Sequence, residues 1–280
     1  MQEIKIERSK LAEFETELKN NEKSAATVEK YVRDVRFFLS FAEGREIDKK
    51  ILLEYKAELG KNYAVASANS MLAAVNSFLR FLGRAELCVK QFRVQRQAFC
   101  SEEKELTKAE YVRLLEAAKH KKNERLYLIL QTICGTGIRV SELRYITAEA
   151  VTRGEARVAC KGNMRRIFLV PELRKKLIAY IKSKGITTGS VFVTRRGKPI
   201  CRGNIWREMK ALCRDAHVSP SKVFPHNLRH LFARTFYGIE KDIVKLADIL
   251  GHASINTTRI YTVTTGEEHK RKMENMRLII

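Results

Sequence analysis

Several features that define familiar classes of protein are absent from these 280 residues. No apolar run approaches the roughly 20 residues that a membrane span requires, and no apolar signal segment follows the N-terminus. There is no long internal repeat or low-complexity tract. The cysteines form no CxxC pair and no cluster with histidine at zinc spacing, so neither a metal site nor a disulfide framework is predicted. We expect a cytoplasmic protein without metal or cofactor, whose six scattered cysteines are Cys88, Cys100, Cys134, Cys160, Cys201 and Cys213.

Acidic side chains are also scarce, because 32 Asp and Glu stand against 54 Lys and Arg, which gives a net charge of +22 and a pI near 9.9. Residues 1–100 carry 18 basic and 14 acidic side chains, and the other 36 basic and 18 acidic side chains place +18 in residues 101–280. A field of this sign and asymmetry favours a polyanionic partner, and nucleic acid is the natural one. The alternative is a generally basic, solvated surface.

Residues 11–82 show the apolar period of helices with short connections. One helix is expected after the N-cap Ser24, and a second is expected to stop at Gly83. Their inward positions are predicted to be Val28, Tyr31, Val32, Val35, Phe38 and Leu39 in the first helix and Leu72, Val75, Phe78, Leu79 and Leu82 in the second. These stripes are expected to build a core and to carry no chemistry.

A basic, weakly periodic segment at residues 84–104 indicates a linker, after which a second domain begins. Its first helix is expected to start at Thr107, with Glu110 as the capping-box partner. Two β-like runs joined around residues 162–163 predict a hairpin, and a further short strand is expected in residues 190–200. The pattern therefore predicts a mainly α fold with a small antiparallel β-sheet.

Two basic residues lie beside glycine turns. In GTGIRVSEL, Arg139 is expected in the first turn of a helix, where its guanidinium and the helix N-terminus together suit a phosphate or carboxylate. An ion pair with Glu142 on the same helix face explains Arg139 equally well. Lys161, near the tip of the predicted hairpin, can reach a phosphate edge or donate a proton, although surface hairpins are rich in ordinary lysines.

The stretch FPHNLRHLFA places a histidine and an arginine on one helical face. Pro225 suits the first helical position, and His226 and Arg229 follow at i and i+3 spacing. His230 points about 100° further round the helix and is interpreted as a supporting residue. A single His-x-x-Arg pair is common in helices, so this signal is weak by itself.

The stretch LGHASINTTRIYT places a histidine nine positions before a tyrosine. Gly251 is expected to end the preceding helix, which leaves His252 on a loop. A short helix capped by Asn256 or Thr257 then carries Tyr261. The plain alternative for Tyr261 is a place at the edge of the core with its hydroxyl in water.

The order of these motifs along the chain is more specific than any one of them. GTGIRVSEL, CKGNMRRIFLVP, HNLRH and LGHASINTTRIYT together resemble the tyrosine recombinase family, also called phage integrases, and the likeness covers nearly the whole chain. The N-terminal helices are similar to the SAM-like core-binding domain of Xer-like members. The resemblance implies a core-binding domain at residues 1–86, a linker at 87–104, a catalytic domain at 105–266 and a tail at 267–280. Two such domains are expected to form a C-shaped clamp on DNA.

The resemblance also implies a catalytic role for six residues, namely Arg139, Lys161, His226, Arg229, His252 and Tyr261. The two arginines would bind the scissile phosphate, and the tyrosine would attack phosphorus to form a 3′-phosphotyrosine. The first histidine would be the general base, the lysine the general acid for the departing 5′-oxygen, and the second histidine a hydrogen-bond donor to the phosphate. Tyr237, the other candidate phenol, better fits a packing role. Met164 departs from the basic residue that is common at its position, which weakens a backbone contact of this loop but not catalysis.

The implied activity is site-specific recombination or integration of double-stranded DNA through a Holliday junction, without ATP or a metal ion. It implies a homotetramer on DNA, assembled from monomers, in the bacterial cytoplasm at the nucleoid, with a DNA-bending or excision factor as a further partner. The apolar tail positions are expected to dock on a neighbouring protomer rather than in cis, and they are Met273, Met276, Ile279 and Ile280. Two alternatives stay open: a type IB topoisomerase-like enzyme that relaxes DNA as a monomer, and a DNA-binding accessory protein with a decayed catalytic site.

Overall fold

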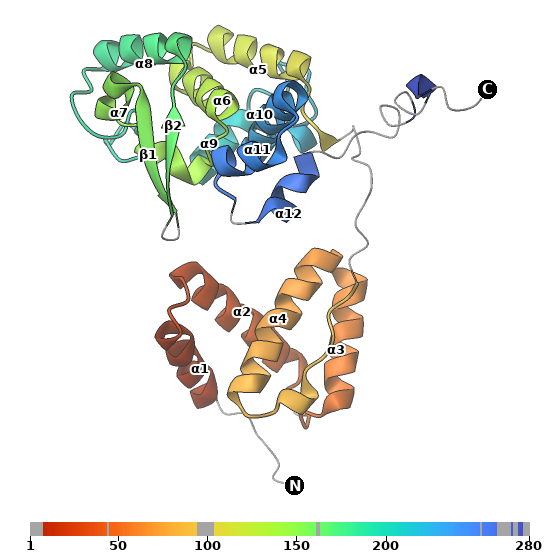
Figure 1. The fold of residues 1–280 in the computed structure, drawn as a ribbon. Coiled ribbons are helices and arrows are strands. Elements are labelled where there is room, and N and C mark those ends of the chain that lie inside the picture. Colours follow the sequence, from red (N-terminus) through yellow and green to blue (C-terminus); the bar gives the residue numbers. More distant parts are fainter. Residues whose placement is uncertain are drawn as a thin grey trace. The chain divides into compact units, whose positions relative to one another are not determined.

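The computed structural model of the chain divides into two compact units, Met1–Arg96 and Gln97–Ile280, and each is described by itself (Figure 1). The structure describes residues 8–43, 45–93, 104–160, 163–252, 254–261, 270 and 274–276. Among these residues no helix has the length and apolar content needed to cross a membrane.

The first unit consists of helices, and capping side chains mark the starts of α2 and α3. The helices are α1 (Arg8–Asn20), α2 (Ala25–Phe41), α3 (Lys49–Asn62) and α4 (Val65–Phe81), followed by the 3₁₀ turn η1 (Ala85–Leu87). The Ser24 hydroxyl accepts a hydrogen bond from the backbone N–H of Thr27, which confirms the predicted cap of α2. Asp48 caps α3 in the same way, whereas Ala64 at the start of α4 offers no side-chain acceptor.

The core of the first unit lies where the sequence predicts it. Helix α2 packs against α1 and α4, and α4 also packs against α3. The predicted inward residues are buried, except for Tyr31, Leu39 and Leu82, which are partly buried. The chain after α4 stays on this unit, because the buried amide of Asn76 bonds both backbone groups of Val89. The first residues of the predicted linker are therefore packed on the first unit.

The second unit is mainly helical and contains one hairpin (Figure 1). Its elements are α5 (Lys108–His120), α6 (Glu124–Thr136), η3 (Val140–Tyr145), α7 (Ala148–Arg153), β1 (Glu155–Cys160), β2 (Asn163–Phe168), α8 (Pro171–Lys184), α9 (Arg202–Lys210), η4 (Pro220–Lys222), α10 (Pro225–Glu240), α11 (Ile243–Leu250), α12 (Ile255–Thr258) and η5 (Arg259–Tyr261). Helix α6 is central, since it packs against α5, α8 and α10. The capping box between Thr107 and Glu110 at the start of α5 is present as predicted.

Strands β1 and β2 pair antiparallel, which confirms the hairpin. Their side chains alternate, so that Val158 and Ile167 are buried while Arg166 and Phe168 are exposed. The mainly α fold with a small antiparallel sheet is thus as predicted.

The further strand expected in residues 190–200 is wrong. This segment makes isolated bridges only, between Val193 and Pro199 and between Thr147 and Ser190. Proline has no N–H to extend a ladder, and the chain turns back at Gly197, so that no regular strand develops there.

Candidate active site

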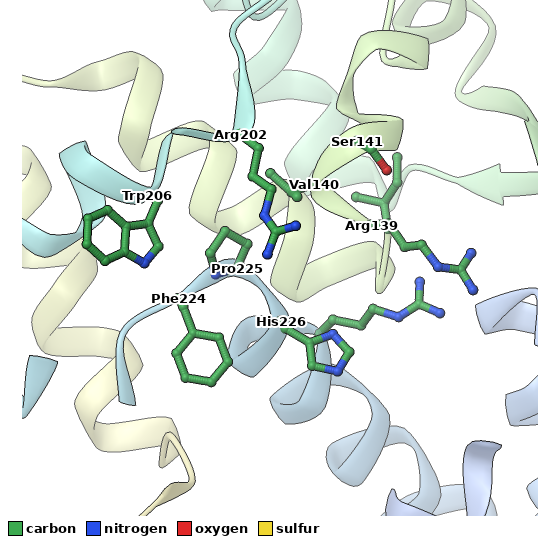
Figure 2. Close-up of a pocket in the computed structure, with 10 residues that line it drawn as sticks. Arg139, Val140, Ser141, Arg202, Trp206, Phe224, Pro225 and His226 are labelled. Atoms are coloured by element: carbon green, nitrogen blue, oxygen red, sulfur yellow. The ribbon is translucent and has the colours of Figure 1, made fainter. Parts of the chain in front are cut away.

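Four segments that are far apart in the sequence meet in the second unit. They are the end of α6 with the start of η3, the first turns of α10, the turn after α11, and η5. Beside them lies a cavity of about 370 Å³ whose lining includes Arg139, His226 and Arg229. In Figure 2, Arg139 stands on one side of this pocket and Trp206 on the other, with Arg202 and His226 between them.

Arg229 is the centre of the site. Its side chain is only 1% exposed, and Pro225 at the first position of α10 starts the helix that carries it, as predicted. The guanidinium donates to the carbonyl oxygens of Gly137 at 2.6 Å and Leu250 at 2.7 Å, and to Nε2 of His252 at 2.9 Å. Burial lowers the pKa of Arg229 to about 10, but this value is still well above neutral pH, so the side chain stays protonated. One buried donor, Nε, has no partner within the described residues.

Arg139 sits at the start of η3, a 3₁₀ helix, one position before the first turn in which it was expected. Its Nη1 donates to Glu142 at 3.0 Å, so the ion pair weighed as an alternative is present. Its Nη2 donates to the carbonyl oxygen of Gly251 at 3.1 Å, and the side chain still lines the cavity. The ion pair and a role toward an anion are therefore compatible.

The carboxylate of Glu142 is buried, and a second arginine binds it. Arg165 of β2 donates to its two oxygens at 3.0 and 2.7 Å. Burial alone raises the pKa of Glu142, but the hydrogen bonds and charges of Arg165 and Arg139 outweigh it and hold the pKa below its usual range. Sequence reasoning missed Arg165; the only signal for it was the alternation of β2, which turns one of two adjacent arginines inward.

Two histidine rings contact the ring of Tyr261, and a third histidine packs on one of them. The ring of His230 lies 4.5 Å from that of His226 and 4.7 Å from that of Tyr261, and the His252 ring stacks 6.0 Å from the Tyr261 ring on another side. Helical spacing predicted that His230 points away from His226 and Arg229, yet its ring lies between those of His226 and Tyr261 and contacts both. His230 lies about 100° round α10 from Arg229 and still faces the site, because η5 packs on that side of α10.

Burial and neighbouring positive charge keep these imidazoles neutral. Burial, with the charges of Arg229 and other nearby cations, lowers the pKa of His226 below its usual range and that of His230 and His252 to about 4. Because arginine has no acceptor, Nε2 of His252 must carry the lone pair, and Nδ1–H donates to the Thr258 hydroxyl at 2.8 Å. In this arrangement His252 has no donor left for a phosphate.

Tyr261 is 3% exposed and lies on η5, not in water at the edge of the core. Gly251 ends α11 in the left-handed conformation, and His252 follows on the loop, as predicted. The cap of the next helix was predicted wrongly: Ser254, rather than Asn256 or Thr257, accepts from the N–H of Asn256, because its side chain precedes the first turn.

Three further features named in the sequence analysis are Tyr237, Lys161 and the tail. Tyr237 lies on α10 and packs, partly buried, against the small hydrophobic cluster that also holds Tyr261. Lys161, which the sequence analysis singled out, is outside the described residues, as is most of the tail. No cluster of His, Cys, Asp or Glu that suits a metal ion occurs in the part of the chain that the structure describes.

Comparison with known proteins places this chain in a family. The model of the phage integrase family matches residues 104–268, and that of the N-terminal SAM-like domain of phage integrases matches residues 11–86. The chain belongs to the phage integrase family. The larger match contains the whole candidate site.

Relatives of this family extend the comparison along the whole chain. Tyrosine recombinase XerA of Thermococcus kodakarensis is 31% identical over 280 residues, covering 96% of this chain and 95% of the relative. A crystal structure of XerA recombinase is 26% identical, with a TM-score of 0.55 over 97% of this chain and 99% of that one. A lambda integrase tetramer bound to a Holliday junction has a TM-score of 0.73 at 18% identity, covering 90% of this chain and 76% of that one, and this likeness concerns the fold alone.

Proposed function

We propose that this protein is a site-specific DNA recombinase that cleaves and rejoins strands through a 3′-phosphotyrosine. The observation that carries the proposal is that four separate segments meet at one site: Arg139, His226 and Arg229 line one cavity, and Arg229 binds His252, whose ring stacks on the ring of Tyr261. Membership of the phage integrase family supports it.

The chemistry begins with the charge of the phosphodiester. A bridging phosphate repels nucleophiles, and its transition state gathers further charge on the non-bridging oxygens. Arg139 lines the cavity, and Arg229 brings a buried Nε donor without a partner in the described residues. Two fixed guanidiniums in a site shielded from water stabilise such a transition state by several kcal/mol.

In the cleavage step, a bond forms between the Tyr261 hydroxyl oxygen and phosphorus while the bond from phosphorus to the 5′-oxygen breaks. His226, neutral and beside the ring of His230, takes the phenol proton, and Lys161 supplies a proton to the departing 5′-oxygen. The phosphotyrosine diester retains the energy of the broken bond. A different 5′-hydroxyl can therefore reverse the step without ATP.

His252 acts in this scheme only after a rearrangement. Its Nε2 accepts from Arg229 in the structure, so donation to the phosphate requires a proton on Nε2 and a turn of the Arg229 donor toward the phosphate. The phosphate supplies the negative charge that raises the pKa of His252 from about 4 and favours this change.

The partner of this reaction is double-stranded DNA, held by both domains as a clamp, with the catalytic domain carrying most of the positive charge. Exchange needs two duplexes cut on both strands, so the working form is a homotetramer on a Holliday junction, formed from monomers. The tail at residues 267–280 docks on a neighbouring protomer, and a DNA-bending or excision factor assists. The site of action is the bacterial cytoplasm, at the nucleoid.

The test is a suicide substrate nicked close to the cleavage point, from which the short 5′-hydroxyl fragment diffuses away. The wild type accumulates a covalent adduct with DNA, and Tyr261→Phe forms none. Lys161→Ala loses cleavage of the normal substrate but cleaves a 5′-phosphorothiolate, whose leaving group needs no proton. Failure of that rescue contradicts only the general-acid role of Lys161 and leaves the rest of the proposal in place.

Assays of supercoil relaxation and of recombinant product, run beside the adduct assay, separate the other candidate functions. A monomer that relaxes supercoiled DNA without recombinant product indicates a type IB topoisomerase-like enzyme, and a protein that binds DNA but never forms an adduct indicates an accessory factor. All six functional groups expected of an active enzyme are present in the sequence, which argues against an accessory protein with a decayed catalytic site.

A further inference from the structure

Arg165 is a partly buried cation that the chemistry above does not use. It lies on β2, its side chain is 12% exposed, and it binds both oxygens of Glu142. The next residue, Arg166, turns to the other face of the strand, where its side chain is 65% exposed and 3.7 Å from Glu155. One strand thus presents two arginines, of which only Arg165 reaches the site.

Glu142 is shared evenly between two arginines. Its Oε1 accepts from Nη1 of Arg139 and Nη1 of Arg165, both at 3.0 Å. Its Oε2 accepts from the backbone N–H of Arg139 at 2.8 Å and from Nη2 of Arg165 at 2.7 Å. Any movement of Arg165 is therefore transmitted to both the backbone and the side chain of Arg139.

A second contact links the same two arginines through Gly251. A Cβ atom at Gly251 would lie 2.6 Å from Nη1 and 2.9 Å from Cδ of Arg165, so the Arg165 side chain covers the bare Cα of this glycine. The carbonyl oxygen of Gly251 in turn accepts from Nη2 of Arg139. Arg165 thus braces β2, η3 and the turn before His252 against one another.

Charge gives this arrangement a consequence for catalysis. With Arg165 present, the network of Arg139, Glu142 and Arg165 carries a formal charge of +1; with Arg165 replaced by a neutral residue, the carboxylate cancels Arg139 and the charge is zero. The Glu142 carboxylate, whose side chain is 5% exposed and which lies 3.0 Å from Arg139, would then oppose the approach of a phosphate.

We propose that Arg165 is a positioning residue that neutralises Glu142, so that Arg139 is both held in place and left with its full positive charge for the scissile phosphate. The proposal rests on the proposed function, because it concerns the phosphate that the function places beside Arg139.

The test is a charge cycle measured as the single-turnover rate of adduct formation at saturating DNA. Arg165→Gln can still donate a hydrogen bond to Glu142 but removes the charge, and we expect the rate to fall about 10- to 100-fold, less than the loss typical of removing a direct donor. Combining it with Glu142→Gln restores the formal charge of the network to +1, and we expect at least about a tenfold recovery over Arg165→Gln alone. The single variant Glu142→Gln completes the cycle.

Two further variants serve as controls. Arg166→Gln removes the same charge from the same strand without touching the network, and its rate at saturating DNA equals that of the wild type. Arg165→Lys keeps the charge and stays within about tenfold of the wild type; it decides the matter if Arg165→Gln melts below the assay temperature. A purely structural Arg165 predicts instead that the losses of the two Gln variants add in the double variant.

The outcomes separate the two proposals. If the double variant is as slow as, or slower than, Arg165→Gln, or if Arg165→Lys loses more than about 100-fold while folded, the role of Arg165 is overturned and the proposed function stands. If the wild type itself forms no adduct, the proposed function fails and the role of Arg165 fails with it.

Discussion

Replacement of Gly137 by alanine perturbs the anchor of Arg229 without touching a proposed catalytic side chain. Gly137 ends α6 with φ of +64°, and its carbonyl oxygen accepts from Nη1 of Arg229. A Cβ atom there would lie 2.4 Å from Cδ1 of Phe232 and 3.0 Å from Cδ2 of Leu250. Phe232 belongs to α10, so its ring yields only if the helix or its packing shifts.

The size of the effect follows from two contributions. The left-handed backbone costs an alanine about 1–2 kcal/mol. Overpacking against the Phe232 ring adds about 1–3 kcal/mol, so Gly137→Ala should lower the free energy of unfolding by about 2–5 kcal/mol in total. Gly185, which ends α8 with φ of +63° and has no atom within 4 Å of an added Cβ, is the matched control. Gly185→Ala should cost only the backbone contribution.

Urea denaturation of the two variants measures the difference, and single-turnover adduct formation at saturating DNA measures its effect on the site. Gly137→Ala should slow the adduct step, because displacement of the Gly137 carbonyl moves Arg229, whereas Gly185→Ala should not. Equal destabilisation by the two substitutions, or full activity of Gly137→Ala, would refute the argument that this glycine positions Arg229.

Three further predictions concern protonation, capping and the central arginine. The pKa of His230 and His252 is about 4 in the folded protein and near 6.5 in the unfolded chain, so the unfolded state binds more protons between these two pH values. The free energy of unfolding should therefore fall as the pH drops from about 6.5 to about 4. Urea titrations should show a smaller fall for His230→Asn, and the same pH dependence in this variant would contradict the lowered pKa of His230. Ala64→Ser should add the missing cap of α4 and raise the unfolding free energy of the first unit by about 1 kcal/mol, and no gain would count against the capping argument. Arg229→Lys should leave a buried carbonyl without a donor and lower the free energy of unfolding by about 1–3 kcal/mol. It should slow cleavage by at least about 100-fold, with DNA affinity nearly unchanged at moderate salt. A parallel loss of DNA affinity would make Arg229 chiefly a binding residue.

Much of the local structure could be predicted because it depends on short-range rules. The period of apolar residues located α2 and α4, and the side chains of Ser24 and Thr107 marked helix starts through bonds to N–H groups three residues away. The glycine turn before His252 was equally readable, since only the residues next to it decide its conformation.

The features that could not be predicted from the sequence depend on contacts between distant segments. The partnership of Arg165 with Glu142 joins residues 23 positions apart, and the contact of His230 with Tyr261 depends on how η5 returns to α10. The expected strand in residues 190–200 failed for a similar reason, because a strand exists only where a partner strand can pair with it.

The central claim is that Tyr261 becomes covalently bonded to DNA, and proteolysis of the trapped adduct followed by mass spectrometry tests it most directly. The account predicts a nucleotide-linked peptide with the phosphate on Tyr261, and no linked peptide from Tyr261→Phe. A phosphate found on Tyr237 or any other residue, or an adduct formed by the phenylalanine variant, would contradict it.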